Sequence, residues 1–342
     1  MKGNVFYILI FYMICALCTG CGNSQSHGEK DVIQVKIATV QAENSPFHET
    51  LLKFVEEVEK RCGDRVKITL YPNSQLSGSE RDLANSVLLG SLEGAMLVDS
   101  VINSVDKVPA ANIGSVPFLF SDADDFYKVM DEYLVDELNR EYREIGLTNV
   151  CYIHAGAIDI ENTVRPIQTP DDMKGLKIRI FDSDGLYKML EACGGNPINM
   201  AFGEVYTGLQ QGAIDGILTN SFQFIPMNFV EVTKYHTDIK AFFNFQSLSF
   251  NSEWFDSLPE DIQEAFIESG QAAYEYDRDV LCPESDAADY TSLEQTNVKV
   301  TYLTDEQREQ FVEKGKTTWN YFEEKIGKNV FDNILNILGK EM

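Results

Sequence analysis

Segments with the pattern of a β-strand alternate with amphipathic helical segments along most of this chain. Residues 32–40 are predicted to form a strand, residues 47–63 a helix with one apolar stripe, and residues 65–72 a second strand. A further helix is predicted at 80–90, before a short apolar strand at 94–100. Because this order is typical of βαβ units, the sequence predicts an α/β fold built mainly on parallel sheets.

The same alternation begins again after Gly156, with a strand predicted at 176–181 and a helix at 183–195. This restart predicts a boundary between two lobes, and a chain of 342 residues is long enough for two. A helical segment at 259–285 begins with proline and acidic residues, and it is long enough to lie along both lobes. Two α/β lobes of this kind are expected to close on a ligand by hinge motion.

The N-terminus has the features of an export signal. Lys2 precedes a short apolar run, which predicts a signal peptide over residues 1–20. Thr19, Gly20 and Cys21 resemble the bacterial lipobox, in which the cysteine is lipidated, and residues 21–30 are polar as in a tether. The alternative is a plain signal peptide cleaved nearby. The mature protein is therefore expected outside the cytoplasm, in the periplasm or at the cell surface, and attached to the membrane only through lipid on Cys21.

The charge balance excludes two classes of partner. The chain carries 54 acidic and 28 basic residues, a formal net charge of −26. A surface this negative repels nucleic acid and anionic lipid, so neither is expected as a partner. An anionic small molecule would need a local basic site.

No catalytic or metal-binding pattern is found in the sequence. The histidines are far apart and lack ligand spacing, and phosphate-binding and nucleophile motifs are absent, so we expect no metal, no cofactor and no enzyme activity. The cysteines of the predicted folded part are irregularly spaced, which leaves both buried thiols and disulfides open. These are Cys62, Cys151, Cys193 and Cys282.

A basic island lies at residues 165–179, with four cations and two carboxylates. Within it, Leu176, Ile178 and Ile180 alternate with Lys177 and Arg179, which places the two cations on the face opposite the apolar one. From this pattern alone, a half-exposed strand with solvated cations is the favoured interpretation, and an anion site is the alternative.

The motifs around this island resemble a known family. "RPIQTPDDMKGLKIRI" (165–180) and "GGNPINMAFGEVYTGLQQGAIDG" (194–216) are similar to the substrate-binding proteins of TRAP transporters, the DctP family. The segments at 35–76, 116–126 and 254–266 also resemble the family's motifs, in the same order. The resemblance implies a two-lobe fold like that of type II periplasmic binding proteins, with a long helix across both lobes. Lobe I would comprise residues 31–156 and about 245–284, and lobe II residues 157–244 and about 285–342.

The resemblance also implies a set of ligand-binding residues. Arg179 matches the arginine that binds the ligand's carboxylate, and Phe202 matches an aromatic residue of the cleft. Where many members carry a second arginine, this chain has Asp159. Polar residues that align with other cleft positions are Glu80, Asp99, Ser100, Thr219 and Asn220. Lys177 is interpreted as a surface residue.

The implied function is that of an extracytoplasmic receptor, expected to be a monomer, which captures an organic acid and delivers it to the permease subunits of a TRAP transporter. One arginine among carboxylates suits a sugar acid such as a uronate, because carboxylates accept hydrogen bonds from hydroxyl groups. A zwitterion, with Asp159 or Asp99 facing an ammonium group, and a C4-dicarboxylate are the alternative ligands. A lipoprotein ligand sensor on the same fold and a secreted hydrolase are the alternative functions.

Overall fold

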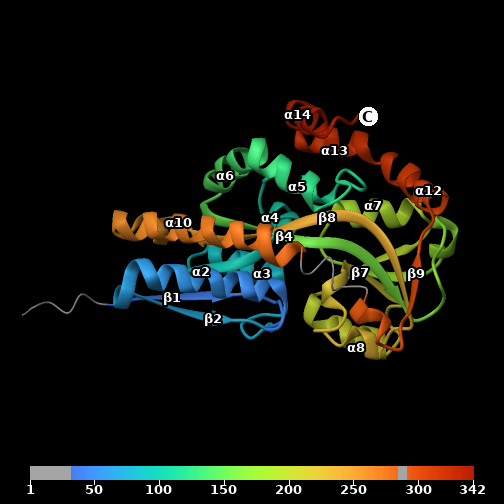
Figure 1. The fold of residues 1–342 in the computed structure, drawn as a ribbon, viewed down its shortest axis with the longest axis horizontal. Coiled ribbons are helices and arrows are strands. Elements are labelled where there is room, and N and C mark those ends of the chain that lie inside the picture. The colour runs from blue at the N-terminus through green and yellow to red at the C-terminus, as the bar shows by residue number, and fades with distance from the viewer. Residues whose placement is uncertain (1–31, 284–290) are drawn as a thin grey trace, which may run out of the picture. The chain divides into compact units, whose positions relative to one another are not determined.

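A computed structural model describes residues 32–283 and 291–342 of the chain (Figure 1). In these residues nine strands form one sheet, in the order β2-β1-β3-β8-β4-β7-β5-β6, with β9 pairing to β8. The strands are β1 (Ile33–Ala38), β2 (Val66–Tyr71), β3 (Gly94–Val98), β4 (Leu147–Asn162), β5 (Lys177–Ile180), β6 (Asn196–Asn199), β7 (Gly216–Asn220), β8 (Tyr235–Asn251) and β9 (Lys299–Tyr302). The predicted α/β class is confirmed.

The sheet is mixed, where the sequence predicted mainly parallel sheets. β1 pairs in parallel with β2 and β3, and β5 with β6 and β7, as βαβ units require. The two longest strands, β4 and β8, run antiparallel to each other and side by side through the middle of the sheet (Figure 1). β8 was not predicted, and β4 continues past Gly156, after which the sequence predicted a boundary between lobes.

Helices cover the sheet. The α-helices are α2 (Pro46–Cys62), α3 (Glu80–Leu88), α4 (Asp99–Val105), α5 (Ala123–Val129), α6 (Val135–Glu144), α7 (Asp184–Ala192), α8 (Val205–Gln210), α9 (Ser252–Asp256), α10 (Glu260–Tyr276), α12 (Asp305–Lys316), α13 (Trp319–Ile326) and α14 (Lys328–Leu338). Short 3-10 turns are η1 (Gly63–Arg65), η2 (Pro109–Ser115), η4 (Pro170–Met173), η5 (Phe202–Glu204), η6 (Ser221–Gln223) and η7 (Phe229–Glu231), and π-turns are η3 (Met130–Leu134) and η8 (Asp277–Leu281). No helix among these is long and apolar enough to cross a membrane.

Local signals account for the ends of the helices. Helix α2 begins after Ser45, whose hydroxyl accepts a hydrogen bond from the amide of His48, and it ends at Gly63 with φ of 56°. Helix α10 begins after Pro259 and continues into η8, so the predicted helix at 259–285 is confirmed as far as residue 283. α10 packs against α2 and β4 (Figure 1).

The buried apolar side chains form two clusters. The larger cluster joins α2, α10 and strands β1 and β3, and the smaller one surrounds β5 and α7. The four cysteines of the predicted folded part are buried thiols, which settles the alternative left open by their spacing: Cys62, Cys151, Cys193 and Cys282. The predicted signal peptide, the tether and Cys21 lie outside the described residues.

Candidate functional site

The four cations of the basic island have different environments. The Arg165 side chain donates to the backbone carbonyls of Asp172 (2.8 Å) and Lys174 (2.7 Å), and so holds the turn before β5. Lys174 forms an exposed ion pair with the neighbouring Asp171. Lys177 donates to two backbone carbonyls near the surface. Arg179 alone is buried, and the island is therefore no general anion-binding surface.

Arg179 lies on a strand inside the sheet, and its side chain is buried. β5 lies between β6 and β7, where Arg179 is in register with Ile198 and Ile217. The sequence pattern left one face of β5 open to solvent, but Arg179 is only 1% exposed. A guanidinium group in such a place must find partners or remain unsatisfied.

One part of the Arg179 guanidinium is unsatisfied. Its Nε donates to the carbonyl of Met200 at 3.0 Å, while Nη1 has no hydrogen-bond partner among the described residues. The guanidinium carbon lies 5.4 Å from the ring centroid of Phe202 and 5.9 Å from that of Phe181. Burial lowers the pKa of Arg179 to about 10, against the opposing effect of Glu80. The group is thus a buried cation whose Nη1 donor has no acceptor among the described residues.

A cavity of about 130 Å³ lies beside Arg179. It is lined by Ser79, Glu80, Arg81, Val101, Arg179, Phe181, Asp182, Asn199, Met200, Ala201 and Phe202. Three of the residues predicted for the site, Arg179, Phe202 and Glu80, are therefore brought together from distant parts of the sequence.

Glu80 is one of two carboxylates that line this cavity, and the other is Asp182. Glu80 is the first residue of α3, and Ser79 before it caps the helix by accepting the amide of Asp82. The pKa of Glu80 is raised to about 7 because burial disfavours its charged form, and the positive charge of Arg179 opposes this rise. Glu80 can accept or donate a hydrogen bond near neutral pH.

An ion pair closes the rim of the cavity. Arg81 binds Asp182, which lies 101 residues further along the chain, and also donates to the hydroxyl of Ser104 at 2.9 Å. Close by, the amide of Gly203 donates to the carbonyl of Gly78 at 3.4 Å. These contacts join the start of α3 and the segment before it to the segments after β5 and β6, so a ligand in the cavity would lie between these two parts of the chain.

Two predicted residues of α4 lie elsewhere. Asp99 is 1% exposed and accepts a hydrogen bond from Tyr142, and burial raises its pKa well above the ordinary value. Ser100 is also buried. Neither lines the cavity, although Val101 does. Ligand contacts of Asp99 and Ser100 stay predictions.

The residues predicted on β4 and β7 lie outside the cavity as well. Asp159 is buried, and its Oδ1 accepts the amides of Ile239 (2.9 Å) and Lys240 (2.8 Å). Thr219 is in register with Asp159, and Asn220 donates to the carbonyl of Gly156 at 3.1 Å. Their contact with a ligand stays a prediction.

The cavity also contains residues that sequence reasoning missed. Arg81, Phe181, Asp182 and Asn199 flank predicted residues or end the strands of the site. The position of Asp182 just after β5 is the available signal, because ligands bind at the carboxyl ends of strands in α/β sheets. Its pairing with Arg81 has no signal in the sequence.

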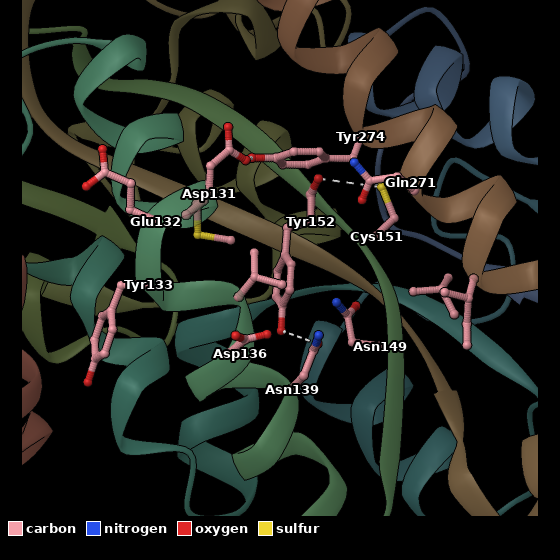
Figure 2. A pocket seen from close by; sticks show the side chains of 14 residues that line it. Asp131, Glu132, Tyr133, Asp136, Asn139, Asn149, Cys151, Tyr152, Gln271 and Tyr274 are labelled. Carbon is pink, nitrogen blue, oxygen red and sulfur yellow. Dashed lines mark hydrogen bonds between the residues drawn. The ribbon is translucent and has the colours of Figure 1, made fainter.

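A larger cavity, of about 360 Å³, lies among η3, α6, β4 and α10 (Figure 2). Asp131, Glu132 and Asp136 line it, and Figure 2 shows the hydroxyl of Tyr152 directed at Asn139, to which it donates at 3.0 Å. Tyr274 donates to Asp131. Because its charged lining residues are all acidic, this cavity does not suit a carboxylate ligand.

Comparison with known proteins gives a consistent result. The family model "Bacterial extracellular solute-binding protein, family 7" (DctP) matches residues 37–325. The C4-dicarboxylate-binding periplasmic protein DctP of Shewanella loihica is 29% identical over 300 residues, 87% of this chain and 88% of that protein. The 2,3-diketo-L-gulonate-binding periplasmic protein of Escherichia coli is 31% identical over 240 residues, 68% of this chain and 70% of that protein.

A solved structure is similar over nearly its whole length. It is a TRAP periplasmic solute-binding protein from Sulfitobacter with bound β-D-galacturonate, and it is 26% identical with a TM-score of 0.81. The match covers 89% of this chain and 98% of that protein.

Proposed function

Because this chain belongs to the DctP family of TRAP-transporter solute-binding proteins, we propose that it captures a sugar acid in the cavity beside Arg179 and delivers it to the membrane permease of a TRAP transporter. The family consists of transport receptors found outside the cytoplasm, so a binding role without turnover is the premise.

The observation that carries the proposal is the unsatisfied donor of the buried Arg179. A carboxylate of the ligand would accept charge-assisted hydrogen bonds from the guanidinium, and would replace the solvation that the cation has lost. The rings of Phe202 and Phe181 beside the guanidinium offer an apolar surface to the carbon skeleton of the ligand.

The remaining lining favours a ligand with one carboxylate and several hydroxyl groups. Glu80, Asp182 and Asn199 supply acceptors for hydroxyl hydrogens in the same cavity. The E. coli relative is named for binding 2,3-diketo-L-gulonate and the Sulfitobacter structure holds galacturonate; both ligands combine one carboxylate with a polyhydroxyl chain or ring.

A C4-dicarboxylate is the second candidate ligand, because Arg81 also lines the cavity. In the structure Arg81 is engaged by Asp182, and a second ligand carboxylate would have to displace that partner. This competition ranks dicarboxylates below sugar acids. A zwitterion would need a carboxylate that faces its ammonium group, a role that Glu80 could fill.

The architecture proposed for this function has two lobes that close around the cavity. Lobe I comprises residues 31–156 and about 245–284, and lobe II residues 157–244 and about 285–342. The separation of two parallel groups, β2-β1-β3 and β7-β5-β6, on either side of β8 and β4 supports this division, while the larger apolar cluster contains residues of both lobes. The Arg81–Asp182 pair would then be a contact between lobes, and α10 with η8 the long helix along both.

The proposed location is outside the cytoplasm, with the chain attached to the membrane by lipid on Cys21. Replacing Cys21 by serine should release the full-length protein from the membrane fraction of its host into the soluble fraction. An unchanged membrane fraction would contradict the lipid anchor but leave the transport function standing.

The ligand is tested by thermal shift with D-galacturonate, D-glucuronate, D-galactonate, succinate and several amino acids. A ligand at 100 times its Kd stabilises the folded protein by about 2.7 kcal/mol. Sugar acids are expected to raise the melting temperature most, and recovery of the ligand unchanged by NMR would support a non-enzymatic role. If none of the organic acids raised the melting temperature, the proposal would be overturned.

A further inference from the structure

A third cavity, of about 770 Å³, lies away from Arg179 and is lined by an unusual number of cations. Lys240 of β8, Arg308 and Lys316 of α12, and Lys340 after α14 all line it. Acidic residues outnumber basic ones 54 to 28 in the chain as a whole. The excess of positive charge here is therefore a local feature, and it has no part in the function proposed above.

The acidic residues around this cavity do not outnumber its cations. Asp238 lies 3.9 Å from Lys240 and 3.7 Å from Arg308, and Asp125 lies 3.3 Å from Lys340. Glu341 is the acidic residue of the lining itself. The lining thus has four cationic side chains and one acidic side chain, and two further carboxylates lie within 4 Å of three of the cations.

Apolar groups form the rest of the wall. Val312 lies on the same face of α12 as Arg308 and Lys316, since the three residues are four positions apart. Phe118 and Trp319 also line the cavity, and the ammonium of Lys316 lies 5.3 Å from the centre of the Trp319 ring. Cavities of about 300–1,000 Å³ with apolar walls and a few charged groups are typical of small-molecule sites.

The backbone around the cavity is held in an uncommon conformation. Phe118 has φ of 57° and Lys240 has φ of 45°, values that bulky side chains seldom adopt. The amide of Phe118 donates to the carbonyl of Ala241 at 2.8 Å, and Arg308 donates to the carbonyl of Ile239 at 2.7 Å. Residues held this way cluster at ligand-binding sites, and the contacts fix the wall before any ligand arrives.

We propose that this cavity is a second ligand site, which binds an organic anion with an apolar or aromatic body. The ammonium groups of Lys240 and Lys316 bind the anionic group, and Phe118, Val312 and Trp319 contact the body. Arg308 and Lys340 donate to protein acceptors and add positive charge to the wall. The site is independent of Arg179 and of the sugar acid.

The probe for this site is 8-anilinonaphthalene-1-sulfonate, which combines aromatic rings with one anionic group and fluoresces when bound. Titration of the full-length protein should give saturable binding of one equivalent, which weakens as salt is added. Lys316→Glu and Lys240→Glu should each weaken binding at least tenfold. Lys314→Glu, an exposed change on the same helix outside the cavity, should leave binding unchanged.

Two controls separate this site from the cavity at Arg179. Saturating D-galacturonate should not displace the probe, and the Arg179→Met variant should bind it normally. Displacement by the sugar acid, or equal affinity of the wild type and Lys316→Glu, would overturn the proposal. Lys316 is exposed, so its variant carries the test if Lys240→Glu fails to fold. Lys316-dependent binding of a hexaglutamate peptide in place of the sulfonate would also overturn it, in favour of an acidic protein segment.

Discussion

Replacing Arg179 by methionine is predicted to weaken ligand binding strongly without destabilising the unliganded protein. The pKa of Arg179 is lowered from 12.5 to about 10 by burial, and this shift corresponds to about 3 kcal/mol by which the site disfavours the cation. Methionine removes that penalty and fills a similar volume. The lost hydrogen bond to Met200 costs about 1 kcal/mol in return, so the unliganded variant should be as stable as the wild type or more stable.

The same substitution removes the main partner of the ligand's carboxylate. Truncating one partner of a buried charge pair costs about 2–5 kcal/mol of binding, which is a rise in Kd of about 30-fold to several thousand-fold. The opposite signs of the two effects are the distinctive expectation. A residue that only supports the fold would lose stability and binding together.

Isothermal titration calorimetry with D-galacturonate measures the affinity, and thermal unfolding without ligand measures the stability. Lys177→Met is the matched control, because it lies two residues earlier on β5 and donates to surface carbonyls near Gly212. Its affinity should equal that of the wild type. An Arg179→Met protein that binds within threefold of the wild type, or that melts far below it, would refute the reasoning.

Three further substitutions test the site and its surroundings. Glu80→Gln should remove a pH dependence of stability. Because the pKa of Glu80 is raised from 4.5 to about 7, its stabilising effect is full below pH 4.5 and is lost as the pH rises through 7. Urea unfolding of both proteins between pH 4 and 8 measures this, and a constant difference in the free energy of unfolding would contradict it. Arg81→Gln and Asp182→Asn should each speed ligand release by up to about fivefold, since an exposed ion pair is worth about 1 kcal/mol or less. Stopped-flow release rates of the double variant should show that the two effects are not additive. Strict additivity would mean that the pair does not close the cavity. Asp159→Ala should lower the free energy of unfolding by about 2–4 kcal/mol, because two backbone amides lose their acceptor. A tenfold loss of ligand affinity in the folded variant would instead support the ligand contact predicted from the sequence.

Local signals predicted the parts of the fold that depend on neighbouring residues. The helix after Ser45 ends at Gly63 as expected, because capping and helix termination involve residues within one turn of each other. The strand at β5 was also recognised from its periodicity, and the helix at α10 from its N-terminal proline and acidic first turn. The antiparallel pairing of β4 with β8 was not, since strand pairing between distant segments leaves no mark in either segment alone.

The residues of the candidate site also divide into those that the sequence indicated and those whose contacts depend on distant segments. The resemblance to the family indicated Arg179 and Phe202 by their motif positions and Glu80 by its alignment with a polar cleft position. The structure places all three around one cavity. For Asp159 the sequence supplied only the observation that an acid stands where relatives often keep an arginine. Its contact with the amides of Ile239 and Lys240 depends on a bend of β8 that lies 80 residues further along the chain.

By itself, the sequence determined an α/β chain of a recognisable family with one cation in position to meet a carboxylate. Only the tertiary structure decided that Arg179 is buried rather than solvated, because the segments after β5 and β6 and the start of α3 surround its side chain, and α3 is distant in sequence. It also decided that Arg81 and Asp182 meet across the rim. The physical reason is that burial and ion pairing are set by which segments pack together, whereas periodicity records only which side of each segment is apolar.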